Sequence, residues 1–98
     1  MGAEDNTIVG FAWYRRNQWP RLLQAADDAS ALEATYDEWH ATATRLITDM
    51  QIRGTRVERV DLDVEKLIYW CNAKGCGIDA NARAEYVSEL LWLRDHGE

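Results

Sequence analysis

Two short segments of the chain have the hydrophobic pattern of β-strands. Residues 7–14 form a nearly continuous apolar run, rich in β-branched and aromatic side chains, which is typical of a strand covered on both faces. Gly10 within this run indicates that another part of the molecule approaches closely there. Residues 55–62 carry more charge, so we expect the second strand near an edge or against a wet face.

A short helix should follow the first strand. Pro20 near a helix start predicts a helix that ends near residues 27 and 28, after which residues 27–34 form a connection. Within that connection, Ser30-x-x-Glu33 is a capping box that competes with a later one for the start of the next helix.

The best-specified element is a long amphipathic helix in the middle of the chain. Thr35-x-x-Glu38 is a capping box, and apolar residues follow it at helical spacing as far as Met50. The helix should reach Arg53, because Gly54 sits where a left-handed C-terminal residue belongs.

Two further helices are expected after the second strand. Asp63 caps the first of them, which should reach about Lys74 and end at Gly75. Asp79 can cap the last helix, whose apolar stripe includes Ala80, Ala84, Val87, Leu90 and Leu91.

The predicted elements follow the order β-α-α-β-α-α in one domain that spans residues 1–98, with residues 1–6 as a disordered or extended tail. This order predicts a helix-rich α/β or α+β fold. Strands joined by a long helical crossover are most often parallel and right-handed, although an antiparallel pairing stays open. Because a two-stranded sheet does not sustain itself in water, we expect dimerisation to complete it.

Composition and charge narrow the classes of function. Of the 98 residues, 47% are hydrophobic and 29% are charged, as in ordinary globular proteins. The net charge of −6 would repel a nucleic-acid backbone. The chain has neither the apolar length of a membrane span nor the pattern of a secretory signal, which favours a soluble cytoplasmic protein. We expect some of the five tryptophans at an interface: Trp13, Trp19, Trp39, Trp70 and Trp92.

Parallel strands would bring charged and aromatic residues together at one end of the sheet. These candidate ligand-binding residues are Tyr14, Arg15 and Arg16 after the first strand and Asp61 and Asp63 after the second. One interpretation is a site for a small anionic metabolite, in which an arginine binds a carboxylate or phosphate, an aromatic ring stacks, and Asp61 orients the ligand or accepts a proton. In the simpler interpretation, which we favour, an arginine pairs with Asp61, Asn17 and Asp63 cap helices, and the aromatic rings pack.

Metal sites have weaker support. Asp61-x-Asp63 could hold Mg²⁺, but helix capping by Asp63 alone explains this pair as well. Cys71 and Cys76 could bind zinc together with two histidines, yet Cys-x₄-Cys is not a diagnostic spacing and the histidines sit singly on other helices. The pattern therefore predicts no metal and no cofactor.

Cysteine chemistry and catalysis have no clear signature either. A disulfide between Cys71 and Cys76 is disfavoured because no export signal accompanies the pair. A cysteine nucleophile would need a base such as His40 within hydrogen-bond distance. We expect a core cysteine and a loop cysteine, and no catalytic residue, because the common catalytic motifs are absent from the sequence.

Several landmarks resemble those of a small family of uncharacterised bacterial proteins of similar length. These landmarks are Trp13-Tyr14-Arg15-Arg16, Tyr36-Asp37-Glu38-Trp39, Gly54 before a valine-rich strand, Asp63, and Trp70-Cys71. The resemblance covers most of the chain and implies a soluble bacterial protein. It implies no activity and no catalytic residues.

Two hypotheses of different class follow. The first, which we prefer, is a homodimeric protein-interaction module without catalytic activity, whose sheet is completed across a twofold axis. The alternative is a binding protein for an anionic metabolite, or a minor enzyme, that uses the five strand-end residues. A third possibility is an acidic surface that docks on a basic protein partner.

Overall fold

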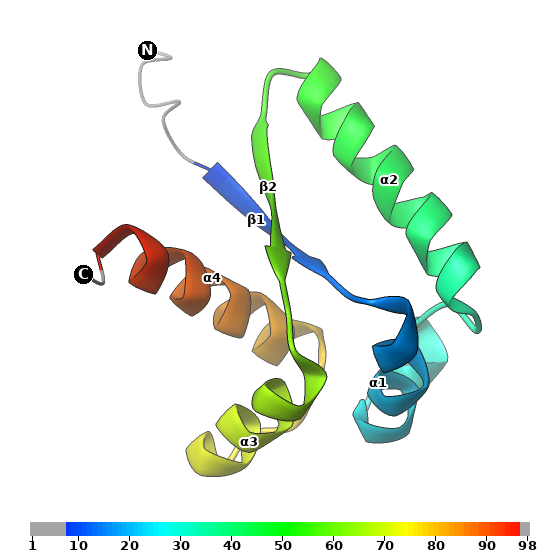
Figure 1. Ribbon diagram of the computed structural model, residues 1–98, viewed down its shortest axis with the longest axis vertical. Helices are drawn as coiled ribbons and strands as arrows, with labels where there is room; N and C mark the ends of the chain where they lie inside the picture. The colour runs from blue at the N-terminus through cyan, green and yellow to red at the C-terminus, as the bar shows by residue number, and fades with distance from the viewer. Residues whose placement is uncertain (1–7, 97–98) are drawn as a thin grey trace.

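Two parallel strands, β1 (Ile8–Trp13) and β2 (Arg56–Asp61), lie at the centre of the computed structural model, which describes residues 8–96 (Figure 1). Their register runs from Ile8 opposite Arg56 to Trp13 opposite Asp61. Both predicted strands and their parallel pairing are confirmed. The expected tail, residues 1–6, lies outside the described residues.

Four α-helices accompany the strands, so the chain is a helix-rich α+β domain. They are α1 (Trp19–Ala25), α2 (Tyr36–Ile52), α3 (Val64–Lys74) and α4 (Ala80–His96). Two 3₁₀ turns, η2 (Arg16–Gln18) and η3 (Ala29–Ala31), lie before and after α1. Within residues 8–96, no helix combines the length and the apolar character needed to cross a lipid bilayer.

Side-chain caps define the starts of three helices, as the sequence predicts. Thr35 Oγ1 accepts a hydrogen bond from the Glu38 amide at 3.1 Å, and Asp63 Oδ1 accepts one from Lys66 at 3.1 Å. Asp79 does the same for Ala82 at the start of α4. Such caps satisfy amide groups that have no partner within the helix.

Two other capping expectations, at Ser30 and at Asn17, are wrong. Ser30 lies inside η3 and does not start the long helix, because the Thr35 hydroxyl occupies that role. Asn17 lies inside η2, and no side-chain cap is formed at the start of either η2 or α1. Pro20 provides the first turn of α1 instead, since its ring favours a helical start without an amide donor.

Helices cover both faces of the sheet. On one face, α4 packs so closely on β1 that a Cβ atom at Gly10 would lie 2.5 Å from Leu91 Cδ1 and 2.7 Å from Val87 Cγ1. The close approach predicted at Gly10 is therefore made by α4. On the other face lies α2, whose Trp39 ring is centred 4.9 Å from the ring of Trp13 (Figure 1). Packing against helices is one of the ways in which a two-stranded sheet gains stability.

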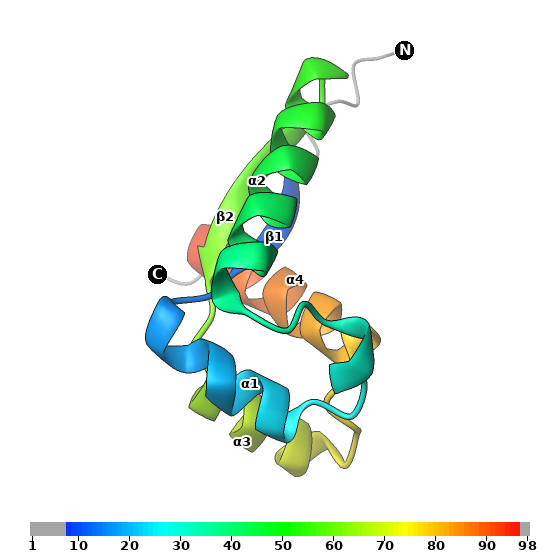
Figure 2. The same cartoon turned by 90° about the vertical axis from the view of Figure 1, so that its right-hand side faces the viewer.

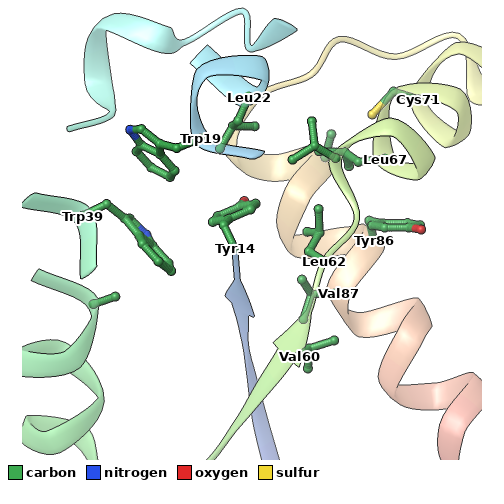
Figure 3. Packing of buried hydrophobic residues seen from close by; sticks show 13 residues of the cluster. Tyr14, Trp19, Leu22, Trp39, Val60, Leu62, Leu67, Cys71, Tyr86 and Val87 are labelled. Carbon is green, nitrogen blue, oxygen red and sulfur yellow. The ribbon is translucent and has the colours of Figure 1, made fainter. Parts of the chain in front are cut away.

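Beyond the C-terminal ends of the strands, α1 and α3 lie side by side (Figure 2). The buried cluster occupies the space between these helices, the strand ends, α2 and α4 (Figure 3). Its fully enclosed members include Leu22, Leu62, Leu67 and Cys71. Trp19 and Trp39 are also buried, whereas Trp92 is 58% exposed. The core therefore accounts for some of the tryptophans, and Trp92 lies on the surface.

Candidate functional site

The strand-end arginines are paired with carboxylates. Arg15 donates two hydrogen bonds to Asp61, from Nη2 at 2.6 Å and from Nε at 3.3 Å. Arg16 turns toward α2, where its Nη2 donates to Asp37 Oδ1 at 2.7 Å and its guanidinium lies 4.8 Å from the centre of the Tyr36 ring. This arrangement follows the simpler interpretation of these residues.

The other predicted site residues, Asp63 and Tyr14, do not take part in these ion pairs. Asp63 caps α3, and its carboxylate is thereby engaged by the amide of Lys66. Tyr14 is 4% exposed and packs edge-on against Trp19 and Trp39. Burial raises the pKa of Tyr14 to about 12, so its phenol is neutral at physiological pH. The structure thus joins Arg15 to Asp61 and distributes the remaining three residues over different surroundings.

Tyr14 belongs to a different feature, a hollow of about 420 Å³ beside β1. Strand β1 lies between α2 and α4, and all three elements contribute to the walls. The residues that line this β1 hollow are Gly10, Phe11, Ala12, Tyr14, Leu32, Trp39, Ala80, Arg83, Ala84 and Val87. Most of these side chains are apolar, and Arg83 is the one charged residue among them.

The Arg83 side chain in the wall of the β1 hollow is held by an ion pair. It is 9% exposed, and its two terminal nitrogens each donate a hydrogen bond of 2.8 Å to the two carboxylate oxygens of Asp28. The hydrogen bond from Arg83 lowers the pKa of Asp28, so the pair is charged at neutral pH. This two-pronged pair ties the connection after α1 to the start of α4.

Sequence reasoning missed Arg83, although a signal for it exists. Ala80, Ala84 and Val87 form part of the apolar stripe of α4, and Arg83 lies at the same helical spacing between them. A charged residue on an apolar helix face needs a buried partner. The sequence does not say which of 17 acidic residues is that partner, and Asp28 is 55 positions away.

The outer edge of β1 faces the hollow. The Leu62 amide donates to the Trp13 carbonyl at 3.0 Å, which shows that the Trp13 peptide groups point toward β2. Peptide groups alternate in direction along a strand, so those of Gly10 and Ala12 point away from β2. Within residues 8–96, no hydrogen bond engages the outward N–H or C=O groups of Gly10 and Ala12.

The outer edge of β2 has a different character. By the same alternation, its outward peptide groups belong to Val57, Arg59 and Asp61. The guanidinium of Arg59 lies 4.6 Å from the centre of the Trp13 ring, and Asp61 carries the Arg15 ion pair. Charged side chains on a strand edge discourage the docking of another strand. Only the β1 edge, among the described residues, combines open peptide groups with an apolar hollow.

Comparisons with known proteins add no relationship: no protein-family model, curated protein or solved structure matches the chain. Within residues 8–96, no group of three or more histidine, cysteine, aspartate or glutamate residues is arranged to hold a metal ion. The fold and its surface define a small α+β domain with an apolar hollow at the open edge of a parallel strand pair.

Proposed function

We propose that the protein is a homodimeric interaction module in which the β1 edge of one copy pairs with the β1 edge of another. The observation that carries this proposal is the set of outward peptide groups at Gly10 and Ala12, which face the β1 hollow. Backbone groups beside apolar surface gain most when they find hydrogen-bond partners that also exclude water. A second β1 supplies both.

An antiparallel pairing of two β1 strands across a twofold axis fits the order of the elements. The combined sheet would run β2-β1-β1-β2, and the same surface would serve both copies. A twofold axis perpendicular to the sheet keeps each face on its own side. The two α4 helices would then lie on one face of the four-stranded sheet and the two α2 helices on the other.

An exposed apolar side chain next to β1 supports the proposal. Trp92 on α4 is 58% exposed and lines a shallow recess together with Ile8 at the start of β1. This side chain is therefore placed to extend the contact beyond the strand. A stable dimer buries roughly 800 Å² on each copy, which one strand pair alone does not provide.

Charge opposes the association. Each copy carries a net charge of −6, so two copies repel each other over distances longer than the contact itself. Salt screens this repulsion, with a Debye length of roughly 8 Å at physiological ionic strength. We therefore expect the dimer to become tighter as salt is added, in contrast to an interface held by ion pairs.

Light scattering coupled to size exclusion tests the proposal. The molar mass should rise from that of one chain toward that of two between low micromolar and submillimolar concentration. The matched pair Trp92→Ser and Tyr69→Ser compares an exposed apolar residue of α4 beside β1 with an exposed apolar residue on α3. Only Trp92→Ser should weaken the association. A single chain at every concentration and salt would refute the proposal.

A second candidate function keeps the strand end as a ligand site. Arg15 and Arg16 are paired, yet their side chains are 56% and 68% exposed, so a small anion can reach both guanidinium groups. Such an anion would compete with Asp61 and Asp37. A thermal shift with citrate or inorganic phosphate tests this alternative, because a ligand at a hundred times its Kd adds about 2.7 kcal/mol of stability. The shift should vanish in Arg16→Ala and persist in Arg94→Ala.

A further inference from the structure

The end of α3 folds back so that two cysteines meet. Gly75 has a φ of 74°, and the Cys76 amide donates a hydrogen bond of 3.0 Å to the carbonyl of Cys71. This bond spans six residues and defines a Schellman turn, in which the side chains of the two bonded residues typically contact each other. The left-handed backbone at position 75 favours glycine.

The turn fixes the distance between the two cysteines. With standard bond lengths, a 3.0 Å bond from the Cys76 nitrogen to the Cys71 oxygen limits the Cα separation to about 6.9 Å. That limit applies to a straight line of atoms, and the bent path of a turn is shorter. Disulfides span Cα separations of about 4.4 to 6.8 Å. The Cα separation in this turn therefore falls within the range that disulfides span.

The two thiols have unlike surroundings. Cys71 is 0% exposed, and burial together with a hydrogen bond shared with the Cys76 thiol raises the pKa of Cys71 to about 11. Cys76 is exposed to solvent. A reagent in solution thus reaches Cys76 first, while Cys71 lies enclosed on the other side of the turn.

The backbone after the turn is anchored as well. The Asp27 amide donates to the Ile78 carbonyl at 2.8 Å, and the Ile78 amide donates to Asp27 Oδ2 at 2.8 Å. A Cβ atom at Gly77 would lie 2.6 Å from the same carboxylate oxygen, which shows how closely the two segments approach. The backbone on both sides of Cys76 is therefore held in place, which keeps Cys76 close to Cys71.

We propose that Cys71 and Cys76 form a reversible disulfide by exchange with a low-molecular-weight disulfide. The Cys76 thiolate attacks one sulfur of the reagent, which forms a mixed disulfide and releases one thiolate. The Cys71 sulfur then attacks the Cys76 sulfur, the second thiolate leaves, and it takes up the proton from Cys71. One protein dithiol and one reagent disulfide thus become one protein disulfide and two free thiols.

Oxidised glutathione is the probe for this exchange. The folded protein is incubated with it, quenched with an alkylating reagent, and weighed as an intact chain. The wild type should lose both thiols without retaining a glutathionyl group. Cys71→Ala should stop at the mixed disulfide on Cys76, and Cys76→Ser should react at least tenfold more slowly. A wild type that keeps both thiols or accumulates only the mixed disulfide would overturn the proposal.

A pair of glycine variants tests the role of the turn itself. Gly75→Ala places a side chain at a φ of 74°, and Gly54→Ala places one at a φ of 93° at the end of α2, remote in sequence from the cysteines. Neither added Cβ atom would meet a neighbour within 4 Å, so both variants carry backbone strain alone. Only Gly75→Ala should slow the second step, by roughly tenfold, with the mixed disulfide accumulating. Equal rates of ring closure in both variants would contradict the proposed positioning.

Discussion

The two outer edges of the sheet differ although both strands share one register and one set of covering helices. The β2 edge carries Arg59 over the Trp13 ring and Asp61 in an ion pair with Arg15. The β1 edge presents Gly10 and Ala12 to an apolar hollow. A strand edge that is not meant to pair is commonly protected by charge. This contrast is the reason for proposing the β1 edge, and not the β2 edge, as the place where two copies pair.

The difference begins with the residues that face α4. Gly10 and Glu58 are opposite each other in register and lie on the same face of the sheet. Gly10 lets α4 settle directly on β1, whereas Glu58 reaches out to an ion pair with Arg94 of α4. Close packing over β1 shapes the wall of the hollow, and a charged contact lies over β2.

The largest expected effect is a loss in the free energy of unfolding when the packing of α4 on β1 is disturbed. Gly10→Val would place its first side-chain atom inside the contact distance of Leu91 and Val87, and overpacking of this kind costs about 3 kcal/mol. The matched variant Glu58→Val removes one surface ion pair and should cost less than about 1 kcal/mol. Urea unfolding of both variants measures the difference. Equal losses would show that α4 does not depend on the glycine.

The next largest effect is a difference in stability between two arginine variants, one in the wall of the β1 hollow and one at the strand end. Arg83→Ala leaves the Asp28 carboxylate half-enclosed without its partner, and we expect a loss of about 2 kcal/mol in the free energy of unfolding. Arg15→Ala removes a pair that also has two hydrogen bonds but lies in solvent, and its denaturation midpoint should not change measurably. If both variants unfold at the same urea concentration, Arg83 is not a structural wall.

Proline substitutions on each strand test which edge of the sheet mediates self-association. Ala12→Pro removes an outward N–H group from β1 and fills its place with a ring, and Arg59→Pro does the same on β2. We expect at least tenfold weaker self-association for Ala12→Pro, or about 1.4 kcal/mol, and little change for Arg59→Pro. Sedimentation equilibrium gives both dissociation constants. A stronger effect from Arg59→Pro would show that the copies associate through the β2 edge and would contradict the proposed β1 interface.

The smallest effect is a pH dependence of the Asp28 and Arg83 pair. Because Arg83 lowers the pKa of Asp28 in the folded state, the pair stabilises the protein above the ordinary aspartate pKa near 4. This contribution, about 1 kcal/mol, is lost as the pH falls through the lowered pKa. Asp28→Asn removes the contribution at every pH, so its difference from the wild type should shrink between about pH 6 and about pH 3. A constant difference would show that the pair does not titrate as described.

Local signals in the sequence predict most of the elements. Thr35, Asp63 and Asp79 act as caps through residues three positions away, so their roles follow from short spacings. Gly10 within a strand also predicts that another element packs closely there, although the sequence does not say which element it is. Such signals suffice for the strands and the helices. The parallel pairing of the strands is only the more common result of a long helical crossover, and the sequence leaves an antiparallel pairing open.

The hollow and its wall were not predictable in the same way. Asp28 and Arg83 meet only because α1, the following connection and α4 come together in three dimensions. The strand-end residues formed the more visible pattern, but Arg15 and Arg16 neutralise nearby carboxylates there. Charged residues adjacent in sequence draw attention, while an apolar hollow consists of ordinary residues whose importance depends on their placement.

Amide hydrogen exchange at the two edges tests the account most directly. Exchange at Gly10 and Ala12 on β1, and at Val57 and Arg59 on β2, is followed by NMR at low and high protein concentration. The amides of Gly10 and Ala12 should become more protected as concentration rises, because they acquire partners in a second copy, and those of Val57 and Arg59 should not change. If Gly10 and Ala12 exchange at one rate at every concentration, β1 does not pair with β1.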